Sequence, residues 1–135
     1  MGDRPARFER VFAVEPDDID ARGHVNNVVY LRWVQDVAAA HWESATTPAE
    51  RADIAWVVLR HEIDYTQAAR PGDQLIARTW VGPPSAATFE RHTEILRARD
   101  QRVLARARSL WCPVHPGTGR PRRIDPALHN RFYER

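Results

Sequence analysis

A long apolar pattern from Tyr30 to Trp42 constrains this chain more than any other feature of its sequence. Apolar side chains recur there at intervals of three and four residues, which is the spacing of one face of an α-helix. Leu31, Ala39 and Trp42 widen that face until little of the helix is left for water. Since a helix that is apolar most of the way round is buried, the sequence predicts an enclosed central helix. Its buried face is expected to contain Tyr30, Trp33, Val34, Val37, Ala38 and His41.

A short polar segment at residues 18–30, DIDARGHVNNVVY, leads into this helix. The first N–H groups of a helix lack intrahelical partners and carry the positive end of the helix dipole, so they can hold an anion or a developing oxyanion. Asn26 or Asn27 is suited to cap the helix. Gly23 allows a left-handed turn and the close approach of a ligand. Asp20 is expected beside the positive helix end, which favours its ionised form.

An ordinary surface turn is the alternative interpretation of the same segment. Asp-x-Asp followed by Gly and Asn is typical of such turns, and the segment taken alone favours that interpretation. The buried helix directly downstream favours a functional loop instead.

This segment resembles the signature loop of the hotdog-fold thioesterases, the 4-hydroxybenzoyl-CoA thioesterase-like group, through Asp18-x-Asp20-Ala21-x-Gly23-His24-Val25-Asn26-Asn27-x-x-Tyr30. The resemblance implies an α+β hotdog fold, in which an antiparallel sheet of about five strands wraps around a long central helix. It implies paired protomers, active sites at their interface, and hydrolysis of acyl-CoA or acyl-carrier-protein thioesters. Later landmarks that fit the same layout are Asp64-Tyr65, Gly72-Asp73 and Gly119-Arg120-Pro121.

The family's catalytic aspartate matches Asp20. The hypothesis is that Asp20 attacks the thioester carbonyl directly, giving a mixed anhydride, or activates a water molecule; the sequence does not separate these routes. Backbone N–H groups near residues 25–27 are expected to polarise the carbonyl or to orient Asp20. Asn27 is a candidate for positioning the water or the carboxylate, although some branches of the family carry a histidine there. His24 is a candidate acid or base, with a packed or capping role as the favoured alternative.

The candidate substrate-binding residues come from the same loop and from one distant arginine. The loop residues are Gly23, Val25, Asn26 and Tyr30, and Tyr30 is also expected to be a core residue with its hydroxyl bonded. Arg120 is a candidate for the phosphates of coenzyme A or for the acidic face of a carrier protein, because a guanidinium binds phosphate through two parallel hydrogen bonds.

Composition limits the remaining classes of function. With 135 residues, 43% hydrophobic and 28% charged, the chain is expected to form one domain over residues 1–135. No apolar stretch is long enough for a membrane span and no export signal is visible, so a cytoplasmic protein is expected. The net charge of +2 argues against nucleic acid. One cysteine, Cys112, excludes an internal disulfide, and neither a metal site nor a cofactor is predicted.

The rest of the chain favours strands with short turns, and therefore an antiparallel sheet. Strands are predicted at residues 8–14, 54–65, 74–81, 88–97 and 102–114. In the strand at 54–65, alternation places Val57, Leu59, His61, Ile63 and Tyr65 on one face, opposite Trp56 and Val58. Short helices are predicted after Thr47, where a lid over the acyl site is one interpretation, and from Asp125 to about Tyr133.

Such a sheet cannot bury both faces in a monomer, and Trp56, Trp80 and Trp111 are large aromatic residues to leave exposed. We therefore expect a homodimer that pairs sheet edges, with a homotetramer as the further alternative. A thioesterase is the leading function. The alternatives are a hydratase acting on enoyl thioesters and a non-catalytic module that binds acyl thioesters. Glu62 is a lower-ranked candidate for the acid.

Overall fold

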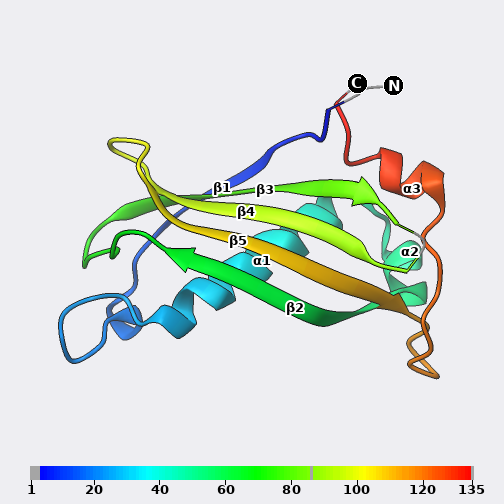
Figure 1. Ribbon diagram of the computed structural model, residues 1–135, viewed down its shortest axis with the longest axis horizontal. Coiled ribbons are helices and arrows are strands. Elements are labelled where there is room, and N and C mark those ends of the chain that lie inside the picture. Colours follow the sequence, from blue (N-terminus) through cyan, green and yellow to red (C-terminus); the bar gives the residue numbers. More distant parts are fainter. Residues whose placement is uncertain (1–3, 86, 135) are drawn as a thin grey trace.

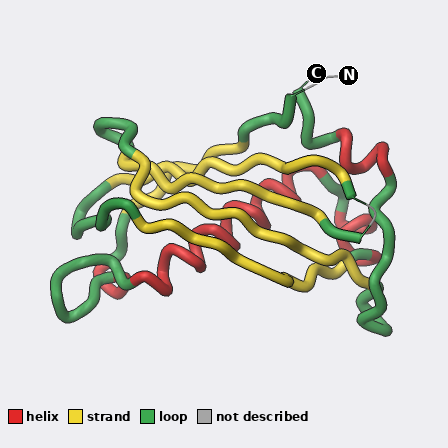
Figure 2. The backbone as a smooth tube through the Cα atoms, in the orientation of Figure 1, coloured by secondary structure: helices red, strands yellow, loops and turns green. Residues whose placement is uncertain are grey.

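The computed structural model describes residues 4–85 and 87–134 and shows one antiparallel sheet with a long helix along one face (Figure 1). The strands form a single layer, with the helix on one side (Figure 2). The strand order is β1-β3-β4-β5-β2, so β1 and β2 are the edges. The predicted α+β hotdog class is confirmed. The strands are β1 (Phe8–Ala13), β2 (Ala55–Tyr65), β3 (Gln74–Pro84), β4 (Phe89–Arg97) and β5 (Val103–Val114).

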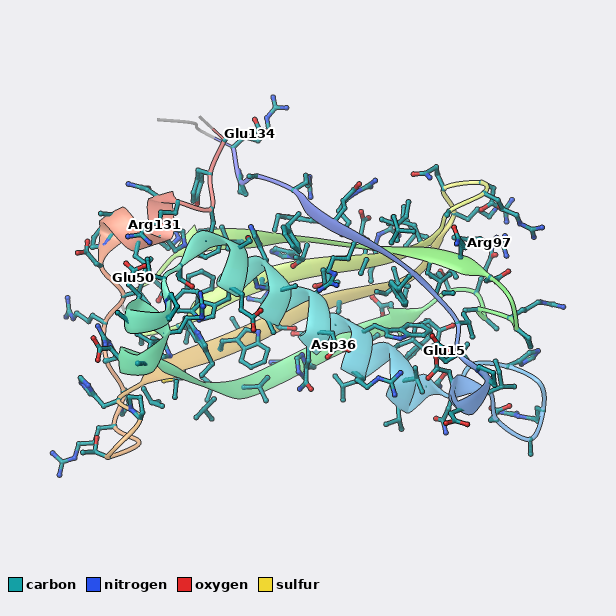
Figure 3. All side chains as sticks on the ribbon, turned by 180° about the vertical axis from the view of Figure 1, so that it is seen from behind. Glu15, Asp36, Glu50, Arg97, Arg131 and Glu134 are labelled. Atoms are coloured by element: carbon teal, nitrogen blue, oxygen red, sulfur yellow. The ribbon has the colours of Figure 1, made fainter. Side chains whose placement is uncertain are left out.

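The central helix α1 (Asn27–Ala45) buries the face that the sequence predicts. Tyr30, Trp33, Val34, Val37, Ala38, His41 and Trp42 are all buried. The prediction that little of this helix meets water is wrong, because Ala39 is exposed between Asp36 and Glu43. Asp36 lies on the side of the helix that faces away from the sheet (Figure 3). The helix therefore covers one face of the sheet and leaves its own outer side open.

A β-bulge in β2 changes which side chains face the helix. The pairing with β5 shifts between Val58 and Arg60, so Leu59 is an extra residue that reverses the alternation. Trp56 contacts Trp42 of the helix before the bulge, and His61 contacts Gln35 of the helix after it. The prediction that Trp56 and His61 lie on opposite faces is therefore wrong. Strict alternation cannot reveal a bulge.

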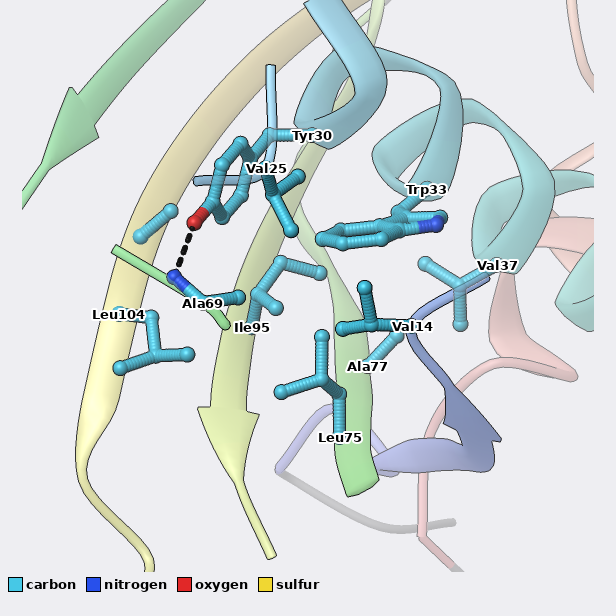
Figure 4. Close-up of a cluster of buried hydrophobic side chains, with 11 residues drawn as sticks. Val14, Val25, Tyr30, Trp33, Val37, Ala69, Leu75, Ala77, Ile95 and Leu104 are labelled. Atoms are coloured by element: carbon cyan, nitrogen blue, oxygen red, sulfur yellow. Dashed lines mark hydrogen bonds between the residues drawn. The ribbon is translucent and has the colours of Figure 1, made fainter. Parts of the chain in front are cut away.

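Two hydrophobic clusters hold the helix on the sheet. One surrounds the first half of α1 and includes Tyr30, Trp33, Leu75 and Ile95 (Figure 4). The other surrounds its second half, where Trp42 packs with Phe132 from the C-terminal segment. Buried polar residues also lie on the helix-facing side of the sheet, namely Thr79, Arg91, Thr93 and Ser109.

The predicted short helices are confirmed, with different bounds at the C-terminal end. Helix α2 (Pro48–Asp53) has the predicted capping box between Thr47 and Glu50. Helix α3 (Pro126–Asn130) is capped by Asp125 and ends before Tyr133. Glu50 and Arg131 form a bidentate ion pair, which ties α2 to the segment after α3 (Figure 3). Helix α2 is therefore anchored to the C-terminal segment.

Phe132 provides a test of this C-terminal closure. Its side chain is fully buried against Trp42, Phe89 and His41. Phe132→Ala should lower the free energy of unfolding by about 3–5 kcal/mol, because it removes a large buried ring and leaves a cavity. Val11→Ala, at a residue that is 65% exposed, should change it by less than about 0.5 kcal/mol. Urea denaturation measures both, and equal effects would contradict the packing described.

Candidate functional site

The two aspartates that precede α1 occupy different environments. Asp18 is buried, with 3% of its surface exposed, and forms an ion pair with Arg32 at 2.8 Å. Its other carboxylate oxygen accepts a hydrogen bond from the backbone N–H of Glu15. Both oxygens are thus occupied inside the protein. Asp18 holds the loop against the first turns of α1.

Asp20 is held from one side and open on the other. Its Oδ1 accepts hydrogen bonds from the backbone N–H groups of Arg22, at 2.9 Å, and His24, at 3.2 Å. Within the described residues, Oδ2 has no hydrogen-bond donor. The two backbone hydrogen bonds, Arg22 first, lower the pKa of the Asp20 carboxyl below its ordinary value. The result is an oriented carboxylate with one oxygen left to react.

Asp20 lines a cavity of about 300 Å³ at the start of α1. Strand β2 and the segment after it form the opposite wall. The structure brings together here five of the residues that the sequence selected, and adds Arg22 of the same loop and four residues from the opposite wall. The selected residues are Asp20, His24, Val25, Asn27 and Tyr30, and those of the opposite wall are Tyr65, Thr66, Gln67 and Ala68. Of the added residues, only Tyr65 carried a signal, as part of the Asp64-Tyr65 landmark.

The backbone N–H groups at the helix start are mostly occupied. The N–H of Val25 donates to the carbonyl of Ala69 at 3.2 Å, and that of Asn26 donates to the carbonyl of Asp18 at 2.9 Å. Of the two asparagines predicted as candidates for the cap, Asn26 caps the helix: its side chain accepts from the N–H of Val28 and is thereby used internally. Among the described acceptors, none binds the N–H of Asn27. That group alone remains for a substrate oxygen.

Tyr30 anchors the wall of the cavity. Its ring is buried at 2% exposure, and its hydroxyl accepts a 2.7 Å hydrogen bond from the backbone N–H of Ala69 (Figure 4). Burial raises the pKa of the Tyr30 hydroxyl, so the group stays neutral. The expectation of a core tyrosine with a bonded hydroxyl is confirmed.

The loop contains three further candidate residues with different roles, namely Gly23, His24 and Asn27. The side chain of His24 is exposed, which contradicts the packed role but leaves the turn role offered beside it; its backbone closes the turn by exchanging hydrogen bonds with Asp20. The side chain of Asn27 is exposed at the first position of α1. Gly23 has φ of 79°, a left-handed conformation that disfavours other residues. This turn aims the His24 N–H at Asp20.

Arg120 does not join the site within one protomer. It lies in the loop between β5 and α3, at the opposite end of the sheet from the loop that precedes α1 (Figure 1). The arginines of β5 are engaged elsewhere, since Arg106 pairs with Glu94 and Arg108 pairs with Glu90 on the outer face of the sheet. Glu62 also pairs with Arg108 there, on the face of β2 away from Asp20.

A second cavity, of about 160 Å³, lies between the second half of α1 and strands β2, β4 and β5. Its walls are aromatic, and Arg91 and Gln35 are its polar lining residues. Arg91 was not among the site residues predicted from the sequence. A signal existed, because alternation in β4 places Arg91 in line with Phe89, Thr93 and Ile95 on the helix-facing side.

Neither cavity is built for a metal, since no group of three His, Cys, Asp or Glu side chains within residues 4–85 and 87–134 is arranged to hold one. Within the same residues, no helix combines the length and apolar character needed to cross a membrane.

Most of the chain matches a known protein family. Residues 14–132 match the family described as the thioesterase-like superfamily. A comparison with curated proteins gave no match.

Solved structures share the fold. A 1,4-dihydroxy-2-naphthoyl-CoA thioesterase from Synechocystis has 20% identity and a TM-score of 0.82, over 94% of this chain and 96% of that one. A predicted thioesterase from Bacillus stearothermophilus has 23% identity and a TM-score of 0.82, over 94% of each chain. The protein SAV2348 from Staphylococcus aureus, solved with CoA, has 13% identity and a TM-score of 0.84, over 95% and 82%.

The hydrogen bonds to Asp20 can be tested by titration. We expect the Asp20 carboxyl to titrate below its ordinary pKa of 3.8, because both amides favour the ionised form. Carbon-detected NMR of labelled protein measures this. Gly23→Ala strains the turn, without a steric clash, and should move the pKa back up. A pKa at or above the ordinary value in the unaltered protein would contradict the geometry.

Proposed function

This chain belongs to the thioesterase-like superfamily and is a thioester hydrolase, and from that premise we propose that it cleaves acyl-CoA thioesters with Asp20 as the reacting carboxylate. The observation that carries the proposal is the state of Asp20. Its carboxylate lines a cavity, is oriented by two backbone N–H groups and keeps one oxygen unoccupied by described donors. The lowered pKa keeps this group ionised at neutral pH.

The chemistry requires an attack on the carbonyl carbon and departure of the thiolate. In one route, Oδ2 of Asp20 attacks directly, the C–S bond breaks, and water later hydrolyses the mixed anhydride. In the other route, Asp20 accepts a proton from water while the water oxygen attacks the carbonyl. Both routes release a carboxylic acid and a thiol. Both use the same free carboxylate oxygen.

Asn27 supplies the second element of the mechanism. Charge develops on the carbonyl oxygen during attack, and a fixed N–H at the positive end of a helix stabilises it. The N–H of Asn27 serves this purpose, because those of Val25 and Asn26 donate to backbone carbonyls. The Asn27 side chain, which is exposed at the same helix end, positions the water or the carboxylate. His24, which lines the same cavity, would give a proton to the departing sulfur.

Coenzyme A is the carrier that the comparisons favour. The Synechocystis structure is that of a CoA thioesterase, and the Staphylococcus aureus protein was solved with CoA. An acyl-carrier protein remains the alternative carrier, for which the arginine-rich surface provides complementary charge.

We propose further that the active unit is a dimer formed through the β2 edge. Strand β2 has 11 residues, against 6 in the other edge strand β1. Its side chains include Val57, Val58 and Leu59, which are 48%, 36% and 56% exposed. A long edge that exposes apolar side chains is covered when a second copy adds its own β2.

This pairing would complete the active site. In a two-fold antiparallel pair, the start of one β2 lies beside the end of the other. Ala55 pairs with Val114, and Val114 with Pro121, so the loop that carries Arg120 lies beside the start of β2. Tyr65, at the end of β2, lines the Asp20 cavity. Arg120 of the partner subunit would therefore approach that cavity, where the phosphates of CoA would enter.

Asp20→Asn tests the catalytic assignment. Thiol release from a panel of acyl-CoAs should fall at least about 100-fold, because the amide neither attacks nor accepts a proton. Asp17→Asn, at an exposed acid of the same loop, is the matched control and should retain activity. Circular dichroism and CoA binding check that both variants fold. Retained turnover in Asp20→Asn would remove Asp20 from the mechanism.

Leu59→Glu tests the dimer. A carboxylate at the centre of the paired edges should shift the protein from dimer to monomer and lower thiol release at least about tenfold, because burying unpaired charges is costly. Val11→Glu places the same charge on the exposed β1 edge and should leave both unchanged. Light scattering after size exclusion gives the mass. A dimer that persists in Leu59→Glu, but not in Val11→Glu, would assign the interface to β1.

A further inference from the structure

Arg91 is a buried cation for which the described part of the chain provides no carboxylate. Only 4% of its surface is exposed, because it lies on the helix-facing side of β4. Burial lowers the pKa of the guanidinium only to about 10, so it remains charged at neutral pH. Buried charges are normally paired with an opposite charge. An unpaired one is a candidate for ligand recognition.

One edge of this guanidinium is used and the other is open. Nη1 lies 2.8 Å from Nδ1 of His41 and donates to the hydroxyl of Thr79 at 3.2 Å. Burial, with a smaller effect from Arg91, lowers the pKa of His41 to about 3, so His41 is a neutral acceptor. Nε and Nη2 share the opposite edge and have no hydrogen-bond acceptor among the described residues, and the guanidinium carbon lies 5.8 Å from the ring centres of Phe89 and Phe132.

The open edge has the geometry that binds carboxylates in this protein. Arg97 holds Asp100 through its own Nε and Nη2, with contacts of 3.1 Å and 2.8 Å. Two parallel N–H groups on a planar guanidinium match the two oxygens of a carboxylate. Arg91 presents the same pair of donors without an acceptor.

The surroundings of Arg91 form a cavity suited to one flat or short acyl group. Its volume is about 160 Å³, and a cavity of about 150 Å³ holds a benzene molecule. Four aromatic residues, among them Trp111, contribute to its walls. Arg91 offers unsatisfied donors beside these walls, so the occupant should bring an acceptor to it. The remaining lining residues are Gln35, Ala38, Ala39, Trp42, Trp56 and Phe89.

We propose that this cavity receives the acyl group of the substrate and that Arg91 binds a carboxylate at the far end of that group, so that the preferred substrates are thioesters of short dicarboxylic or carboxyaryl acids. This inference rests on the proposed thioesterase function. A plain fatty acyl chain would leave the open edge of Arg91 without an acceptor, and would gain nothing from it.

The proposed dimer provides the route from Asp20 to this cavity. Within one protomer, Asn27 and Ala38 are separated by about 16 Å along the helix axis, too far for a small acyl group. The antiparallel β2 pair instead brings Trp56 of the partner subunit close to the end of β2 that lines the Asp20 cavity. The thioester would react at Asp20 while its acyl group occupies the partner's cavity.

The test compares matched substrates by their rates of thiol release. One pair is adipoyl-CoA and hexanoyl-CoA, and the other is 4-carboxybenzoyl-CoA and 4-methylbenzoyl-CoA. The unaltered protein should favour the carboxylated member of each pair at least tenfold in kcat/KM. In Arg91→Met, which replaces the cation by an apolar side chain of similar length, this ratio should fall to about one or below. Arg91→Lys, which keeps the charge without the two-pronged edge, should give an intermediate ratio.

Arg106→Met is the matched control, since Arg106 faces outward on the adjacent strand β5 and pairs with Glu94. It should leave the ratio unchanged. A ratio near one in the unaltered protein, or a ratio retained in Arg91→Met, would overturn the proposal even if thioesters are hydrolysed.

Equilibrium binding separates this inference from the proposed function. Calorimetry of adipoyl-CoA and hexanoyl-CoA with the Asp20→Asn protein should show tighter binding of adipoyl-CoA, and Arg91→Met should remove the difference. Such a result without any thiol release from the unaltered protein would refute the hydrolase mechanism and support the Arg91 site. Equal affinities for the two thioesters would refute the Arg91 site alone. Thermal unfolding checks that the Arg91 variants are folded.

Discussion

Burial of the apolar face of α1 against the sheet is the interaction on which the rest of the structure depends. Tyr30 and Trp33 fill one cluster and Trp42 fills the other, so the helix is fixed along most of its length. The loop before it is fixed in turn by the ion pair of Asp18 with Arg32 and by the hydrogen bond from the N–H of Val25 to the carbonyl of Ala69. A reactive carboxylate needs a rigid support to act at a defined distance from its substrate.

Local patterns in the sequence predicted the elements because the relevant signals are local. Periodicity located α1, and Asn26 and Thr47 form the caps that their chemistry suggests. The face of β2 could not be predicted in the same way. The bulge at Leu59 arises from pairing with a strand about fifty residues away, and neither residue type nor spacing in β2 records it.

The candidate site was predictable in part because several of its residues are close together in the sequence. Asp20, His24 and Asn27 lie within one loop, so the motif brought them together in sequence before the fold did. Which N–H groups remain free depends on distant acceptors such as Ala69. The environment of Arg91 depends on His41, fifty residues away. Both facts required the tertiary structure, although an arginine in an otherwise inward-facing row of β4 was visible in the sequence.

The charged side-chain atoms that lack a described hydrogen-bond partner indicate how the substrate is recognised. Asp18 uses both carboxylate oxygens within the protein, and Arg97 uses its two-pronged edge on Asp100. Asp20 and Arg91 each use one side only, and the other side has no described partner. A charged side chain whose hydrogen-bonding atoms are all occupied within the protein stabilises the fold. One that keeps unoccupied atoms beside a cavity can stabilise a bound ligand instead. The proposed substrate satisfies both, with its thioester at the anion and its distal carboxylate at the cation.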